Sequence, residues 1–288
     1  TKAQCIVLNG RSNIQFDGLL INRRATNWAG TNLVYINCYG LTFDNCWVIG
    51  SNSDSGDSYA FQHSVCDTIV FNGGGYVDSG GAVKRERGIA GRHGSNFRIT
   101  GTQVAGIDDH WGYRYLIQGV HAAVRGIGIS GGDVTLLDCS NPSGPLYQLR
   151  SDAPYADGGL LIERCHALGQ LVRSYRAVDA RPTRRKSFDR IVARDSTVVA
   201  VPGQSAMEFD GFPSTDARSP TQSILTDNVR LLGSINSNTS HLIKGNAQYI
   251  TAHEVTMRGG QLRPYGDPNP VARNLTSNVS ADRITAEN

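Results

Sequence analysis

The stretch LTFDNCWV (residues 41–48) alternates apolar and polar residues, then has a polar pair and a small residue. Alternation with a period of two is typical of a β-strand with one buried face. Segments of the same kind recur along the chain: NFRITGTQV (96–104), VTLLDC (134–139), LLIERCHAL (160–168), RIVARDSTVV (190–199), SILTDNVRLL (223–232) and YITAHEVTM (249–257). None of these segments continues into a 3.6-residue pattern long enough for a helix.

The residue that follows the polar pair recurs about every 30 residues. The aligned positions are Leu19, Cys46, Gly74, Thr102, Cys139, Cys165, Ser196, Val229, Val255 and Ile284. The successive intervals are 27, 28, 28, 37, 26, 31, 33, 26 and 29 residues. A β-coil of this length cannot bury its inner face alone, so the coils must stack. The sequence therefore predicts an all-β fold, a single-stranded parallel β-helix of about ten coils, as one domain over residues 1–288 of a longer chain.

The composition excludes several classes of partner. The net charge of +3 and the pI near 8.5 predict neither a nucleic-acid nor a membrane partner. Among the six cysteines there is no C-x-x-C pair and no metal-ligand spacing with the histidines, so no metal is expected. Cys46, Cys139 and Cys165 take the same inward place in their coils, where a free thiol acts as a small apolar residue.

A second strand in each coil is predicted from stretches such as YAFQHS (59–64) and AMEFDGF (206–212). If its apolar residues point inward, its polar residues form an outward column along the rod. The members of this column are Gln62, Arg92, Gln118, Arg150, Arg173, Glu208, Asp210 and Lys244. Such a column is either a long, shallow binding face or a solvated surface.

The stretch GIDDHWGYRYLIQG (106–119) contains two adjacent carboxylates, Asp108 and Asp109. Adjacent like charges push one pKa up, which supplies an acid and a base at neutral pH, as glycoside cleavage requires. Consecutive strand residues point to opposite faces, so a second carboxylate from another coil is the alternative. The nearest candidates are Asp54, Asp57, Asp78, Asp152 and Asp157.

Two stretches supply further candidate site residues. GRHGSN (91–96) gives Arg92, a clamp for a carboxylate, and His93, a proton shuttle like His110. Aromatic side chains beside these charges suit stacking on sugar rings. The candidates for substrate binding are Arg92, Trp111, Tyr113, Arg114, Gln118, Arg150, Arg173, Glu208 and Asp210.

The coil pattern and the inward cysteines resemble the pectin-lyase-like right-handed parallel β-helix group, and within it the bacteriophage tailspike depolymerases. GIDDHW is similar to the paired-aspartate motif of the polygalacturonase branch, and GRHGSN is similar to its Gly-His-Gly segment. The order of the two is reversed here, and no Arg-Ile-Lys follows. The resemblance implies an extracellular or virion-tail homotrimer that binds and cleaves bacterial surface polysaccharide, such as O-antigen or capsule, without a cofactor.

Three functions are consistent with these residues. The first is an endo-acting glycoside hydrolase with Asp108 and Asp109 as acid and base, tuned by His93 and His110. The second is a lyase in which arginines neutralise a uronate and a histidine or Tyr113 removes the α-proton. The third is a glycan-binding adhesin without catalysis.

Overall fold

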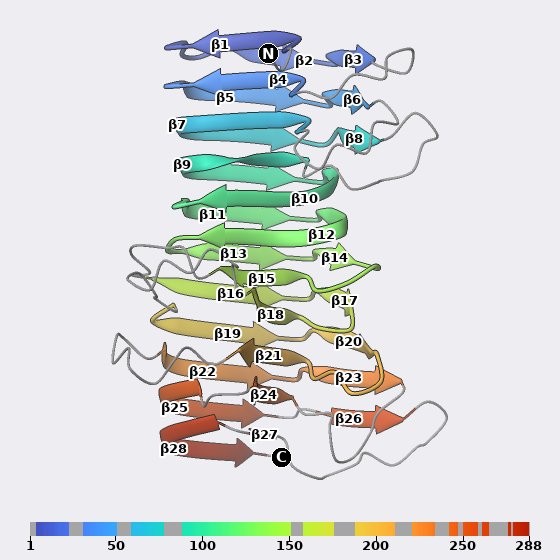
Figure 1. Ribbon diagram of the computed structural model, residues 1–288, viewed down its shortest axis with the longest axis vertical. Coiled ribbons are helices and arrows are strands. Elements are labelled where there is room, and N and C mark those ends of the chain that lie inside the picture. Colours follow the sequence, from blue (N-terminus) through green and yellow to red (C-terminus); the bar gives the residue numbers. More distant parts are fainter. Residues whose placement is uncertain are drawn as a thin grey trace.

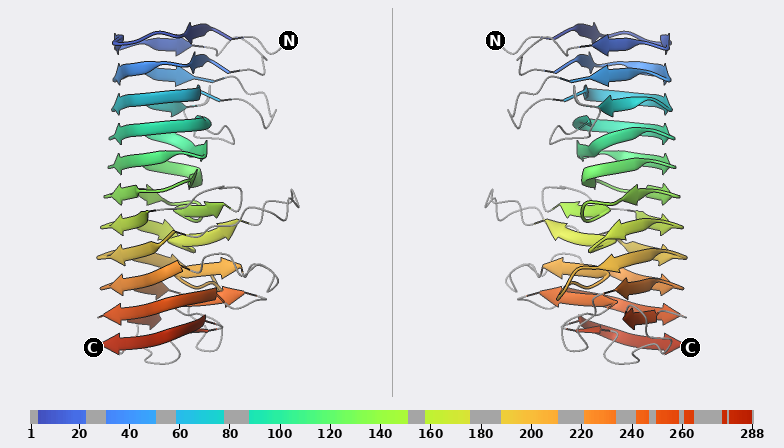
Figure 2. Two further views of the ribbon diagram at one scale, coloured as in Figure 1. Left: turned by 90° about the vertical axis from the view of Figure 1, so that its left-hand side faces the viewer. Right: turned by 90° about the vertical axis from the view of Figure 1, so that its right-hand side faces the viewer.

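The computed structural model describes residues 4–22, 31–50, 59–77, 88–150, 158–175, 188–210, 221–233, 242–246, 250–258, 261–264, 276–277 and 279–287. This part of the chain is built from strands and turns and contains no helix. The strands pair in parallel and stack along the long axis of the molecule, with the two termini at opposite ends (Figures 1 and 2). The predicted all-β parallel β-helix is thus confirmed. None of the described segments is a helix long and apolar enough to cross a membrane.

Each coil contributes strands to three faces of the rod. The first face contains β1 (Ile6–Asn9), β4 (Leu33–Ile36), β15 (Tyr147–Arg150), β18 (Val172–Tyr175), β21 (Met207–Asp210), β24 (Ile243–Asn246) and β27 (Thr276–Ser277). The second face contains β2 (Gln15–Asp17), β5 (Tyr39–Asp44), β11 (Tyr113–Gln118), β13 (Val134–Leu137), β16 (Gly159–Glu163), β19 (Arg190–Arg194), β22 (Thr221–Asp227), β25 (Ile250–Arg258) and β28 (Val279–Glu287).

The third face contains β3 (Leu20–Asn22), β6 (Trp47–Ile49), β8 (Gly75–Val77), β14 (Ser140–Asn141), β17 (His166–Leu168), β20 (Thr197–Ala200), β23 (Arg230–Gly233) and β26 (Gln261–Pro264). Several strands turn a corner, and for four of them the ladders show which faces they join. β7 (Phe61–Asn72) and β9 (Ile89–Thr100) pass from the first face to the second, whereas β10 (Gln103–His110) and β12 (His121–Ser130) pass from the third to the first.

The register of the first face reveals a coil that the sequence pattern concealed. Ile89, Ile107, Ile127 and Tyr147 are successive ladder partners and lie 18, 20 and 20 residues apart. The inward ladder runs through Ile6, Leu33, Phe61, Ile89, Ile107, Ile127, Tyr147, Val172, Met207 and Ile243. The 37-residue interval therefore contains two short coils, and YRYLIQGV lies on the second face instead of the first.

The corner between the second and third faces is a single residue in the left-handed conformation. Asn45, Asp138, Asp195 and Asn228 have φ between 46° and 54° there. Asparagine and aspartate accept this conformation because their short side chains hydrogen-bond locally. One residue of the polar pair thus forms the bend in the chain. This explains why the pair precedes each inward small residue.

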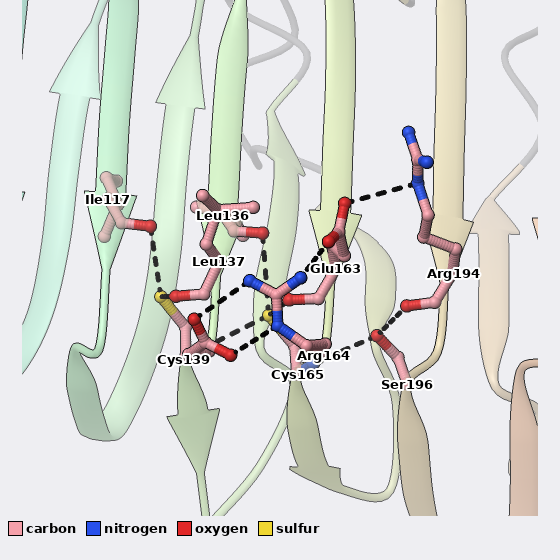
Figure 3. Close-up of polar contacts among 10 residues, drawn as sticks. Ile117, Leu136, Leu137, Cys139, Glu163, Arg164, Cys165, Arg194 and Ser196 are labelled. Atoms are coloured by element: carbon pink, nitrogen blue, oxygen red, sulfur yellow. Dashed lines mark hydrogen bonds and ion pairs between the residues drawn. The ribbon is translucent and has the colours of Figure 1, made fainter.

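The inward residue after this corner is small in most coils. Cys46, Cys139 and Cys165 are buried free thiols, as expected. The thiols of Cys139 and Cys165 donate to the carbonyl oxygens of Leu137 and Glu163, at 3.2 Å in both cases (Figure 3). A thiol at this place therefore caps the end of the preceding strand, a role that Ser196 takes in the next coil.

Candidate functional site

A pocket of about 460 Å³ lies on the outer side of the first face, over β4, β7, β9 and β10. In Figure 1 these strands lie in the upper half of the rod, with β9 directly above β10. The lining residues are Gln4, Val34, Ile36, Tyr59, Gln62, His63, Ser64, Ala90, Gly91, Arg92, Asp108, His110 and Trp111. Four of the residues predicted from sequence, Arg92, Asp108, His110 and Trp111, therefore meet in one pocket.

Strand β10 points two polar side chains into this pocket. Asp108 and His110 alternate with Asp109, so both face outward, and their side chains are 15% and 34% exposed. His110 Nε2 lies 3.9 Å from Asp108 Oδ1. Asp108 has the small neighbours Ala90 and Gly128 in the ladder, which leave room above its carboxylate.

Arg92 is the ladder partner of His110 on β9 and is exposed. Adjacent rungs of a parallel ladder lie about 4.8 Å apart. A guanidinium, an imidazole and a carboxylate thus share one patch of the pocket. The patch can bind an anionic group and move a proton beside it.

An aromatic edge closes one side of the pocket. The rings of Trp111 and His93 are 4.7 Å apart with an interplanar angle of 36°. Both residues occupy the corner after the first face with φ of 66° and 55°. Bulky residues are uncommon in this conformation, and such outliers cluster at functional sites.

The structure revises the assignment of Asp109. This residue points into the rod, its side chain is 0% exposed, and it lies on the opposite side of the sheet from Asp108. Asp109 Oδ2 accepts hydrogen bonds from the Gly94 amide at 3.1 Å and from the Tyr115 hydroxyl, and lies 2.9 Å from His63 Nε2. Because a strand alternates its faces, Asp108 and Asp109 cannot act as acid and base on one substrate in this arrangement.

Asp109, His63 and Tyr115 form a buried polar cluster that packs against the ring of Phe97. Burial, followed by the charge of Asp109, raises the pKa of the Tyr115 phenol well above its ordinary value. The ring of Tyr115 stacks on Phe97 at 4.8 Å, and that of His63 lies 4.6 Å from Phe97. Sequence reasoning passed over His63, although the alternation in YAFQHS places it on the same face as Phe61, and it took Tyr115 for an exposed stacking residue, whereas Tyr115 is buried.

Three predicted binding residues lie away from the pocket. Tyr113 and Arg114 are the first two residues of β11, and the Arg114 guanidinium carbon lies 5.0 Å from the Tyr113 ring centroid. Gln118 is on the second face, between Thr100 and Leu137 in the ladder. The pattern misplaced Gln118 because it assigned the short coil to the wrong face.

The other predicted residues lie farther along the first face. Arg173 and Glu208 are ladder partners at the C-terminal half of the rod. Glu208 accepts a hydrogen bond from Gln170. Arg150 and Asp210 belong to β15 and β21 on the same face. The alternative acids Asp54, Asp57, Asp78, Asp152 and Asp157 lie outside the described residues.

Within the described segments, no group of three or more His, Cys, Asp or Glu side chains is arranged to hold a metal ion. The fold and the pocket together define a parallel β-helix with a polar, aromatic-edged pocket on its first face.

No protein-family model matches the chain, and no curated protein matches it. Among solved structures, the chain is similar to the crystal structure of the Pseudomonas phage phi297 tailspike gp61, with 12% sequence identity and a TM-score of 0.47. The likeness covers 91% of this chain and 49% of that one, so the chain spans about half the length of that tailspike.

Proposed function

We propose that this protein is a tailspike-type depolymerase that binds an acidic bacterial surface polysaccharide along its first face and cleaves it in the pocket. The observation that carries this proposal is the shared position of Arg92, Asp108, His110 and Trp111 in the pocket. Aromatic rings stack on the C–H faces of sugars, and a guanidinium pairs with a sugar carboxylate.

The kind of polar groups in the pocket favours β-elimination over hydrolysis. Glycoside hydrolysis uses two carboxyl groups about 5 to 9 Å apart. Asp108 is the single acidic residue in the described lining, so that lining supplies one carboxyl group and not the pair that hydrolysis uses. One carboxylate that pairs with one imidazole instead forms a single proton-transfer unit.

In this mechanism Arg92 binds the carboxylate of a uronate residue and stabilises the charge that develops when the neighbouring C–H bond ionises. His110 takes that proton, and the Asp108 carboxylate stabilises the resulting imidazolium. The glycosidic C–O bond breaks as a carbon–carbon double bond forms. The imidazolium then returns the proton to the departing oxygen.

Hydrolysis is the second candidate, because the Asp108 carboxylate opens to the pocket and suits a general acid. It requires a second carboxyl group from elsewhere in the chain. The two reactions differ in product, since elimination leaves an unsaturated sugar that absorbs ultraviolet light.

The test compares wild type with three variants, His110→Gln, Asp108→Asn and Arg92→Gln. Each protein is incubated with a panel of acidic bacterial polysaccharides. Polymer length is followed by size-exclusion chromatography together with ultraviolet absorbance. We expect shortening with new absorbance in wild type and a loss of about 10²-fold or more in His110→Gln.

Tyr113→Phe is the matched control, because Tyr113 does not line the pocket. Shortening without absorbance indicates hydrolysis. Binding of the polymer without shortening indicates an adhesin, and full activity of His110→Gln contradicts the proposed chemistry.

The proposal includes a homotrimer that acts outside the cell or on a virion tail, as the resemblance implies. Sedimentation equilibrium of the purified protein tests the trimer. A monomer at all concentrations contradicts it.

A further inference from the structure

A buried ladder runs directly behind the pocket. Its members, Tyr35, His63, Gly91 and Asp109, are successive inward partners on β4, β7, β9 and β10. The residues immediately before and after each member are the outward lining of the pocket: Val34, Ile36, Gln62, Ser64, Ala90, Arg92, Asp108 and His110. The inner ladder and the pocket are thus two sides of the same four strand segments.

One contact in this ladder spans a rung. His63 and Asp109 lie on either side of Gly91, so their contact of 2.9 Å bridges two rung spacings, or about 10 Å of backbone. Both side chains are 0% exposed. Tyr115 reaches the same carboxylate oxygen from the second face. The cluster of His63, Asp109 and Tyr115 therefore ties three strands together inside the core.

Glycines clear the space for this cluster. A Cβ atom on Gly91 would lie 2.6 Å from the His63 ring. On Gly94 it would lie 2.4 Å from Asp109 Oδ2 and 2.8 Å from His63 Nε2. On Gly112 it would lie 2.8 Å from the same carboxylate oxygen. These three glycines make room for the side chains of the cluster.

We propose that His63, Asp109 and Tyr115 are positioning residues for the pocket. They fix the position of β7 and β10 along the rod axis and the rotation of these two strands. Asp108, His110 and Trp111 are thereby held close together. The inference rests on the proposed function for its link to catalysis, although its structural part does not. Apolar packing is non-directional, whereas buried hydrogen bonds to a carboxylate are short and directional. The hydrogen bonds of this cluster converge on Asp109 Oδ2 and select one arrangement of the strands that carry them, whereas Asp109 Oδ1 and His63 Nδ1 have no partner in the described part of the chain.

The test replaces the cluster by apolar side chains in the variant His63→Phe, Asp109→Leu, Tyr115→Phe. Removal of all three polar groups leaves little buried polarity unpaired, so the fold is expected to survive. The first readout is the fluorine NMR spectrum of protein labelled with 5-fluorotryptophan, assigned through tryptophan-to-phenylalanine variants. We expect the Trp111 resonance to shift or broaden and that of Trp47, on the third face, to stay unchanged.

The second readout is cleavage of the polysaccharide that wild type degrades. We expect kcat to fall by about 10²-fold, because a misplacement near 1 Å at the reacting groups has that effect. KM should change less. Asp109→Asn keeps an acceptor for Tyr115 and the Gly94 amide, so it should restore most of the wild-type rate.

The control is the double variant Ser196→Ala, Thr226→Val, which removes buried polar groups far from the pocket. When its loss of thermal stability equals that of the apolar triple variant, this control should leave both readouts at wild-type values. Wild-type Trp111 resonance and wild-type kcat in the apolar variant overturn the inference.

If the triple variant does not fold, Tyr115→Phe alone takes its place, with the same expected directions. If wild type cleaves nothing, the proposed function fails, and the Trp111 resonance still decides whether the cluster positions the pocket.

Discussion

At the scale of single residues, the corners of the coil use the left-handed conformation. Most corners have asparagine, aspartate or glycine at this place, whereas the corner beside the pocket contains Val65, His93 and Trp111 with φ of 53°, 55° and 66°. A branched side chain in this conformation crowds its own backbone and lowers stability. The edge of the pocket therefore contains residues in an unfavourable backbone conformation, which lowers the stability of the fold.

This strain predicts a stabilising substitution. The Val65 side chain is 55% exposed, so its removal loses little packing. Val65→Asn should raise the free energy of unfolding by about 1 kcal/mol, since asparagine tolerates the left-handed region. Chemical denaturation at neutral pH measures the change.

The matched control is Val7→Asn, because Val7 is similarly exposed, at 52%, but lies in the extended strand β1. There the loss of a β-branched residue should leave stability equal or lower. Equal gains in both variants would mean that the backbone conformation of Val65 is not the cause.

Alternation along a strand predicts which residues share a face, but it does not predict which face is buried. Alternation along GIDDHW correctly raised the prospect that Asp108 and Asp109 point to opposite faces. Which of the two faces outward depends on whether Ile107 or Asp108 joins the inward ladder, and the apolar neighbours on other coils decide that.

At the scale of elements, adjacent coils approach so closely that some positions admit only glycine. A Cβ atom on Gly131 would lie 1.5 Å from the carbonyl oxygen of Gly112 in the previous coil. Any side chain there must push two coils apart. The short coils between Ile89 and Tyr147 contain several such contacts, which explains how they close with few residues.

Gly131→Ala is therefore expected to lower the free energy of unfolding by about 3 kcal/mol. Gly73→Ala is the control, because Gly73 has φ of 67° but a methyl group on its Cα would meet no atom within 4 Å. Its loss should be about 1 kcal/mol, from the backbone conformation alone. Similar losses in the two variants would contradict the steric explanation.

At the scale of the whole molecule, buried phenols couple folding to alkaline pH. Burial raises the pKa of Tyr35 well above its ordinary value, and neighbouring thiols and Asp109 raise it further. The folded state thus retains a proton that the unfolded chain loses near pH 10. Stability is fully present below that pH and falls above it, by about 1.4 kcal/mol per pH unit for each such group.

Tyr35→Phe tests this coupling. The Tyr35 hydroxyl has no hydrogen-bond partner in the described part of the chain, so its removal should keep or raise stability at pH 7. Above pH 10 the free energy of unfolding should fall less steeply with pH than in wild type. The difference in slope should be about 1.4 kcal/mol per pH unit, which is the contribution of one phenol. Urea denaturation at a series of pH values measures both effects, and an unchanged slope contradicts the retained proton.

The sequence by itself determined the repeat, the strands and the stacking. Period-two alternation, the polar corner pair and the inward cysteines are local signals, and each coil repeats them in its own residues. The sequence also predicted one site that contains Arg92, Asp108, His110 and Trp111 together with His93 and Asp109, and the first four of these line the pocket.

Only the tertiary structure decided the lengths of the short coils and the depth of each carboxylate. Val120 continues the ladder of Thr102 and Cys139, but a coil of 18 residues closes only through contacts between glycines on different coils. The cluster of His63, Asp109 and Tyr115 joins residues up to 52 positions apart. Such contacts depend on how many residues each coil uses for its corners, and the alternation within a strand contains no information about that number.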